Sequence, residues 1–143
     1  MTLRKVIIKT KIAEINDSLK LVKDNLPSSL SQFKKMGLIK DGIYKRMEYA
    51  IENVFDICSI INSDLKLGVP VDNEDILNNL YEADVIDDIT MDKLKSMKGF
   101  RNILVHRYGK IEDDMAFKIL NDNLDYFDHF LEVIEEFMKK NNH

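Results

Sequence analysis

The sequence is poor in the residues that break helices and in those that carry thiol or imidazole chemistry. Among 143 residues there are five glycines, two prolines, one cysteine, three histidines and no tryptophan. The single cysteine, Cys58, excludes an intramolecular disulfide. It lies in an apolar run, which indicates a core residue and disfavours a catalytic thiol, because burial raises the pKa of a thiol.

Long hydrophobic runs are also missing. No apolar stretch approaches the roughly 18 residues that a membrane-spanning helix requires. The N-terminal segment MTLRKVIIKTK lacks the apolar region of a signal peptide. We therefore expect a cytoplasmic protein that makes no contact with a membrane.

Charge is distributed unevenly along the chain. The formal net charge is -4, yet the segment from Lys93 to Lys110 holds six basic residues and no acidic one, which leaves 15 basic and 25 acidic residues elsewhere. A solvated helix face would account for this segment. The alternative is a local anion site on an acidic body, which favours a phosphate-bearing ligand at that place and repels it elsewhere.

Apolar residues recur at steps of three and four, a spacing typical of amphipathic helices. No segment alternates convincingly with period two, so we expect no sheet. The expected helical segments are residues 8–26, a short stretch within 28–36, and residues 41–67, 72–83, 88–108 and 113–140.

Helix-ending residues separate these segments. The first ends near Pro27, Gly68 with Pro70 closes the third, Asp72 caps the next one, and Gly109 closes the segment that precedes the last. The pattern predicts an all-α protein, an up-and-down four-helix bundle with a short extra helix, folded as a single domain over residues 1–143.

The residues that carry chemistry gather in KGFRNILVHRYGK, residues 98–110. At about 100° per residue, Arg101 and Tyr108 share one helix face, whereas His106 lies about 140° from the arginine. The three side chains are too widely spread for one intrachain site. A two-fold dimer would bring two arginines and two histidines into one groove.

Two histidines and two arginines suit RNA cleavage without a metal. Imidazole serves as base or acid near neutrality, and guanidinium stabilises the charge that builds on a phosphate. Tyr108 would orient a phosphate or stack on a base. The structural alternatives are a histidine that caps a helix and an arginine on a solvated face.

Other acidic clusters favour simpler interpretations. Glu48, Glu52 and Asp56 at steps of four indicate a solvated helix face, and Asp122 with Asp125 and His129 is interpreted in the same way. We expect no metal site and no cofactor. The basic segment makes Lys98, Arg107 and Lys110 the expected RNA-binding residues.

Beyond these patterns, the sequence resembles a known family. RNILVHRY matches the arginine, polar residue, three residues, histidine, any residue, tyrosine motif of the HEPN superfamily in its HepT-like branch. The resemblance extends over nearly the whole chain, through the first helix ending in NLP, the segment AIENVFDIC, the LGVP turn and MKGFRNILVHRYGKI.

The resemblance implies a helical homodimer that acts as a metal-independent endoribonuclease toxin of a type VII-like toxin–antitoxin pair. It implies Arg101 and His106 as catalytic, Asn102 as the supporting polar residue, and Tyr108 as the residue that a partner MNT-type nucleotidyltransferase modifies with AMP. The alternative is a non-catalytic helical module that binds such a nucleotidyltransferase and presents a nucleotide or substrate to it.

Overall fold

The protein was analysed as a computed structural model, which describes residues 3–106 and 110–141. These residues form helices joined by short connections, and none of them is assigned to a strand. The helices are α1 (Lys5–Asn25), α2 (Leu30–Lys34), α3 (Leu38–Asp64), α4 (Asn73–Glu82), α5 (Asp88–His106), α6 (Asp113–Asp122) and α7 (Asp125–Lys140).

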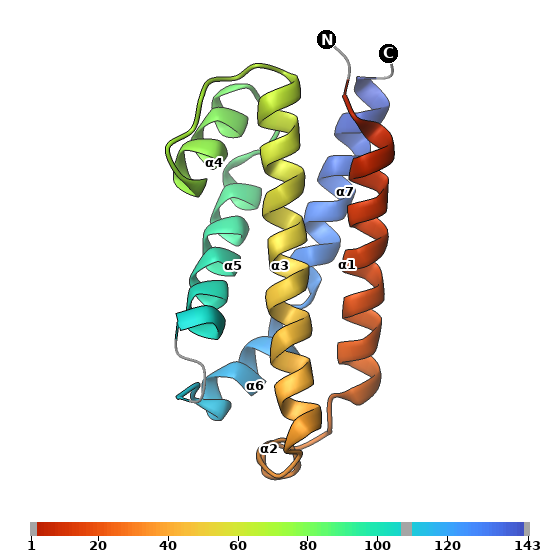
Figure 1. Cartoon of the computed structure of the whole chain (residues 1–143), viewed down its shortest axis with the longest axis vertical. Coiled ribbons are helices and arrows are strands. Elements are labelled where there is room, and N and C mark those ends of the chain that lie inside the picture. Colours follow the sequence, from red (N-terminus) through yellow and green to blue (C-terminus); the bar gives the residue numbers. More distant parts are fainter. Residues whose placement is uncertain (1–2, 107–109, 142–143) are drawn as a thin grey trace.

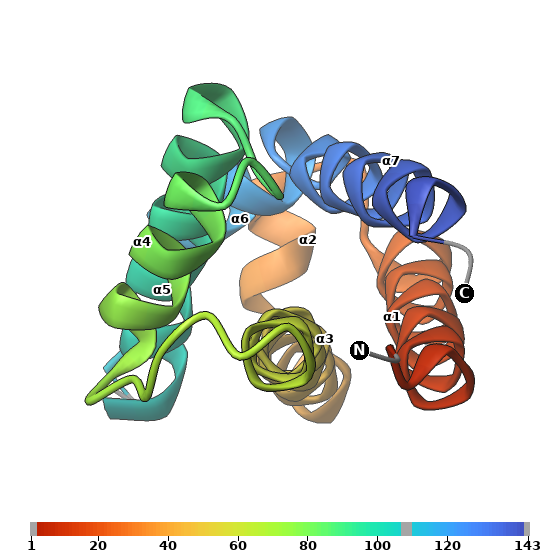
Figure 2. The ribbon, with the colours of Figure 1, turned by 90° about the horizontal axis from the view of Figure 1, so that it is seen from above.

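The long helices α1, α3, α5 and α7 run alternately up and down (Figure 1). Seen from above, they surround one interior, with α1 beside α3 and α4 on the outside next to α5 (Figure 2). The short helices α2 and α6 lie at the same end of the bundle and contact each other. The predicted all-α up-and-down bundle is confirmed, and α2 is one of the short additions to it.

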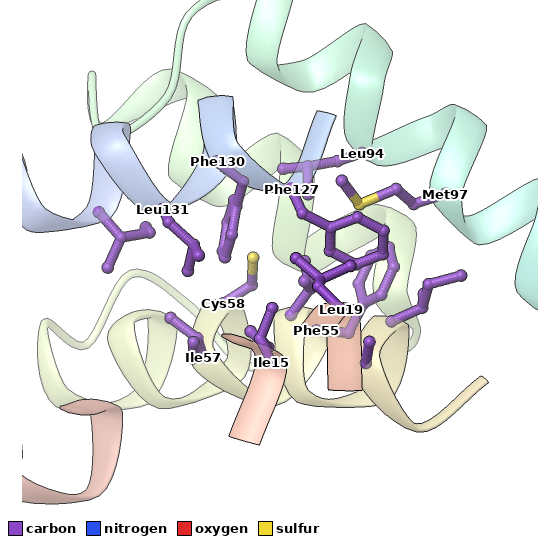
Figure 3. Close-up of a cluster of buried hydrophobic side chains, with 14 of the residues drawn as sticks. Ile15, Leu19, Phe55, Ile57, Cys58, Leu94, Met97, Phe127, Phe130 and Leu131 are labelled. Atoms are coloured by element: carbon purple, nitrogen blue, oxygen red, sulfur yellow. The ribbon is translucent and has the colours of Figure 1, made fainter. Parts of the chain in front are cut away.

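All long helices contribute to a single hydrophobic core. In its centre, Ile15 and Leu19 of α1 meet Cys58 of α3 and Phe127 and Phe130 of α7 (Figure 3). Cys58 is completely buried, and burial raises the pKa of its thiol to about 12. The thiol is therefore neutral near pH 7, and the prediction of a core cysteine is confirmed.

Backbone caps set the ends of the helices. Asp72 caps α4 as predicted, because its carboxylate accepts a hydrogen bond of 2.9 Å from the backbone N–H of Asp75. Helix α3 ends at Asp64, three residues earlier than expected. Lys66 adopts a left-handed conformation with φ of 53°, and the N–H of Leu67 returns to the carbonyl of Asn62 at 3.0 Å.

The prediction of one continuous helix over residues 113–140 is wrong. The chain turns at Asn123 and Leu124, so that α6 lies across the end of the bundle while α7 runs along it (Figure 1). Asp122, Asn123 and Asp125 have low helix propensity. The apolar spacing continues through the turn because Leu120, Leu124 and Phe127 are all buried in the same core.

None of the helices in the described part of the chain is both long and apolar enough to span a bilayer. The expected cytoplasmic location stays a prediction.

Candidate active site

The start of α5 is anchored by a polar cluster that joins it to α7. The carboxylate of Asp87 accepts hydrogen bonds from the backbone N–H of Thr90 at 2.8 Å and from its hydroxyl at 2.7 Å. These bonds lower the pKa of Asp87. The Thr90 oxygen also lies 2.9 Å from His129 Nε2. Because the hydroxyl proton goes to Asp87, Nε2 of His129 is the donor.

The body of α5 is held by its apolar face. Leu94, Met97, Phe100 and Leu104 are buried, and the first two lie against Phe127 of α7 (Figure 3). Ile103 is half-buried. This packing sets the rotation of α5 about its axis and so determines which way the polar residues of the motif point.

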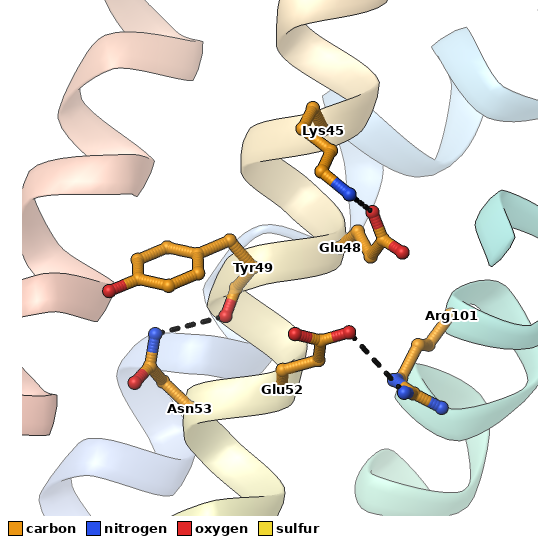
Figure 4. Close-up of polar contacts among 6 residues, drawn as sticks. All are labelled: Lys45, Glu48, Tyr49, Glu52, Asn53 and Arg101. Atoms are coloured by element: carbon orange, nitrogen blue, oxygen red, sulfur yellow. Dashed lines mark hydrogen bonds and ion pairs between the residues drawn. The ribbon is translucent and has the colours of Figure 1, made fainter.

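The side chain of Arg101, a residue of α5, points toward α3. Its Nη2 atom is 3.3 Å from Oε1 of Glu52, and the two side chains face each other across the helix interface (Figure 4). Glu52 was expected on a solvated face. Glu52 and Asp56 are partly exposed, in keeping with that expectation, and all three carboxylates form ion pairs, the other two being Glu48 with Lys45 and Asp56 with Lys11.

His106 and Asn102 are exposed in the last turns of α5. Arg101 and His106 are separated by about 140° around the helix, and no hydrogen bond joins them within the described residues. One chain therefore offers the arginine on the side of α3 and the histidine to solvent. As the helix spacing predicted, the two side chains do not form a single site within one chain.

The remaining predicted residues are only partly covered. Lys98 is half-buried and Lys110 is exposed. Arg107 and Tyr108 lie outside the described residues, as does the expected helix stop at Gly109. Their roles stay predictions.

A second polar cluster anchors the start of α6, and sequence reasoning missed it. Asp113, the first residue of α6, accepts hydrogen bonds from Nζ of Lys40 at 2.8 Å and from the hydroxyl of Tyr44 at 2.5 Å. Burial would raise the pKa of Asp113, but these two bonds and the charge of Lys40 outweigh it and hold that pKa below its usual value. Burial and the bond to Asp113 raise the pKa of Tyr44.

Two hollows in the described surface differ in their relation to α5. One of about 640 Å³ lies between the α4–α5 connection and α7 and contains none of the predicted site residues. Another, of about 250 Å³, is lined by α3, α5 and the turn between α6 and α7. Within the described ranges, no three His, Cys, Asp or Glu side chains converge as a metal site.

The molecule is a helical bundle with an arginine and a histidine near the end of its third long helix, and comparison with known families identifies the class of protein to which it belongs. The family model described as "Ribonuclease HepT-like" matches residues 15–134. The chain belongs to the HepT-like ribonuclease family. The predicted resemblance and the predicted enzyme class, a ribonuclease, are confirmed.

Individual relatives agree. The chain is 31% identical over 129 residues to the mRNA nuclease HepT of Shewanella oneidensis, covering 90% of this chain and 96% of that protein. It is 25% identical over 113 residues to a putative RNase of Archaeoglobus fulgidus, which covers 79% of this chain and 85% of that one.

Solved structures show the same fold. A tri-AMPylated Shewanella oneidensis HEPN toxin in complex with an MNT antitoxin superposes with a TM-score of 0.81 at 31% identity, covering 91% of this chain and 97% of that one. The Bacillus subtilis protein YutE, of unknown function, reaches the same TM-score of 0.81 at 14% identity over 97% of this chain and 93% of its own, and shows the fold alone.

Proposed function

We propose that the protein is the toxin of a type VII-like toxin–antitoxin pair and cleaves RNA without a metal, at a site that two copies of the chain build together. The observation that carries the proposal is the disposition of Arg101 and His106. Both are accessible near the same end of α5, yet they point in different directions. A homodimer related by a two-fold axis places the arginine of one copy near the histidine of the other.

The chemistry follows from these two side chains. One His106 imidazole takes the proton of a ribose 2′ hydroxyl, and the 2′ oxygen attacks the adjacent phosphorus. The bond from phosphorus to the 5′ oxygen breaks, and the second His106, as imidazolium, donates a proton to that oxygen. The products are a 2′,3′-cyclic phosphate and a 5′ hydroxyl. Arg101 stabilises the charge on the phosphate oxygens at the transition state.

The present partner of Arg101 is compatible with this role. A single contact of 3.3 Å to a partly exposed carboxylate keeps the guanidinium in place but leaves most of its donors unused. A phosphate offers paired, shorter bonds in exchange. Asn102 supports the site from the exposed turn before His106, and Lys98, Arg107 and Lys110 hold the RNA backbone.

Silencing by AMP on Tyr108 is the second part of the proposal. It is supported by the similar toxin whose structure is described as tri-AMPylated and bound to an MNT antitoxin. Each added AMP brings a negative charge and bulk close to His106 in the sequence, which opposes RNA binding. Incubation with ATP and the partner nucleotidyltransferase should add AMP masses to the wild type and none to Tyr108→Phe; equal modification of both would contradict this assignment.

The nuclease proposal is tested by incubating the protein with RNA in excess EDTA. We expect products ending in a cyclic phosphate, and a loss of roughly 100- to 10,000-fold in rate for His106→Ala. His129→Ala is the matched control, because that histidine is engaged with Thr90 at the other end of α5. Equal rates for wild type and His106→Ala would refute the catalytic role, and cleavage abolished by EDTA would refute metal independence.

A further inference from the structure

Four exposed residues of α5 form a stripe that leads to His106. Lys95, Gly99, Asn102 and His106 follow one another at steps of four, three and four, which places them on one side of the helix. They offer a cation, a bare backbone, an amide and an imidazole. This stripe is on a different side of α5 from Arg101, which faces Glu52.

An apolar hollow opens beside the stripe. Its volume is about 250 Å³, and Gly99 and Ile103 of α5 are among the residues that line it. Asn123 and Tyr126, at the turn where α6 gives way to α7, line it as well. The hollow therefore brings together a helix of the motif and the break that the apolar spacing did not predict.

The lining of the hollow suits a flat aromatic ligand. The buried residues Phe100 and Phe127 and the half-buried residue Tyr126 are among those that line it. Faces of aromatic side chains bind nucleobases by stacking. A hollow of about 250 Å³ is slightly smaller than the roughly 300 Å³ at which sites for drug-sized ligands begin. That size suits a single base better than a larger cofactor.

The polar groups at the rim suit a nucleotide as well. The Asn123 side-chain amide is half-buried and forms no hydrogen bond with any other residue in the described part of the chain. It therefore has a donor and an acceptor available for the edge of a base. Lys93 lies over the ring of Tyr126 at 4.4 Å from its centre, and Lys95, which directly precedes the lining residue Ser96 in the sequence, is exposed. Both cations favour the phosphate that accompanies a base.

We propose that this hollow binds one nucleobase of the RNA substrate and thereby selects the sequence around the cleaved bond. Gly99 lies seven residues before His106, about 10 Å along the helix axis, so the bound base belongs to a nucleotide close to the one whose 2′ hydroxyl loses its proton to His106. The absence of a side chain at Gly99 lets the sugar and phosphate pass close to the helix. The inference rests on the proposed function, because it takes the substrate to be RNA.

The test is a binding cycle between the protein and abasic RNA. The probe is a short RNA with a 2′-O-methyl group at the scissile position, which prevents cleavage, and with an abasic nucleotide introduced at each position in turn. For the wild type we expect one position, near the cut, at which removal of the base weakens binding about tenfold or more. Gly99→Leu should bind the intact RNA as weakly as the wild type binds the RNA that is abasic at this position. Removal of the base at this position should then weaken the binding of Gly99→Leu no further.

Gly99→Leu is informative because it should fold. A Cβ atom at this position meets nothing within 4 Å, and leucine is a better helix former than glycine. Gly42→Leu is the matched control: Gly42 lies within α3, its Cβ would also meet nothing within 4 Å, and it is not part of the hollow. This control should retain the position dependence of the wild type. A second variant, Asn123→Leu, should weaken binding of the preferred RNA and leave binding of the RNA that lacks this base within a few-fold of the wild type.

Failure of this inference and failure of the proposed function are distinguishable. Gly99→Leu should raise KM and leave kcat within a few-fold, whereas His106→Ala should lower kcat. If no RNA is cleaved, the binding cycle still decides the base site. Equal position dependence in the wild type and Gly99→Leu would overturn the inference. The inference would also be overturned if the hollow binds free nucleoside monophosphates while removal of no single base from the RNA weakens binding to the wild type.

Discussion

Two ion pairs of this protein, one at Asp113 and one at Arg101, differ in the length and number of their bonds and in their exposure. At the start of α6, Asp113 is held at 2.8 Å by Lys40 and at 2.5 Å by Tyr44, with the lysine and aspartate side chains 20% and 18% exposed. At the motif, Arg101 has one contact of 3.3 Å to Glu52, and these side chains are 29% and 42% exposed.

The difference separates a structural contact from an available one. Several short bonds in a partly buried place stabilise the fold, because the charges lose little to solvent screening. A single long contact near the surface contributes about 0–1 kcal/mol and exchanges readily for a better partner. Arg101 is therefore held by a contact that a phosphate can displace, which is compatible with its proposed role.

The largest effect that tests this contrast is expected at Arg101. Arg101→Ala should lower kcat about 100- to 1,000-fold, because a charge-stabilising donor is lost at the transition state. Its free energy of unfolding should change by less than about 1 kcal/mol. Cleavage rate and urea denaturation are measured on the same samples. Arg46→Ala, at an exposed arginine of α3, is the control and should keep full activity. If Arg101→Ala instead unfolds, the role of Arg101 is structural.

The opposite pattern is expected at Asp113. Asp113→Asn should lower the free energy of unfolding by about 1–2 kcal/mol, since Lys40 and Tyr44 lose a charged acceptor. The activity per folded molecule should stay within a few-fold of the wild type. Asp114→Asn is the control, because the pair of Asp114 with Lys34 is much more exposed. An unchanged stability in Asp113→Asn would contradict the structural role.

The pH dependence of the unfolding free energy of wild type and Asp113→Asn follows from the direction of the shift in the pKa of Asp113. The pKa of Asp113 is lower in the folded state than its usual value of 3.8. The stability that its charge contributes is therefore complete above that value and is lost as pH falls through the lower folded pKa. The difference in unfolding free energy between wild type and Asp113→Asn should be constant from pH 5 to 7 and shrink in acid, as measured by urea titration at each pH. A difference that grows in acid would contradict the sign.

The smallest effect is expected at Glu52. Glu52→Gln removes the carboxylate beside Arg101 and should change the stability by about 1 kcal/mol or less. RNA binding at low salt should tighten by roughly two- to fivefold, because a negative charge near the proposed phosphate site is gone. Anisotropy titrations at two salt concentrations measure this. Weaker binding and lost cleavage in Glu52→Gln would instead make Glu52 a positioning residue that Arg101 requires.

Much of the fold could be predicted from local patterns. The apolar spacing located every long helix, and the cap at Asp72 was identified from one residue type followed by an apolar periodicity. The break at Asn123 was missed, because Leu120, Leu124 and Phe127 keep the helical spacing on both sides of it. A periodic pattern records which residues are buried and says nothing about a change in helix direction.

The candidate site was predictable in its residues and not in its contacts. Arg101, Asn102 and His106 stand out by residue type and spacing, and the separation of Arg101 from His106 follows from helix geometry. Glu52 is 49 residues from Arg101, and Lys40 is 73 residues from Asp113. Nothing local marks such partners, because they meet only when the helices pack.

The amino-acid sequence alone determined that this chain is helical and which side of each helix is buried, and it singled out the candidate residues near the end of α5, because these properties depend on neighbours within one or two helical turns. Only the tertiary structure decided that Arg101 faces a carboxylate, that Asp113 is clamped to α3, and that a hollow lies open beside the stripe ending at His106. Those features depend on the packing of α3, α5, α6 and α7, and packing is a property of surfaces that are distant in the chain.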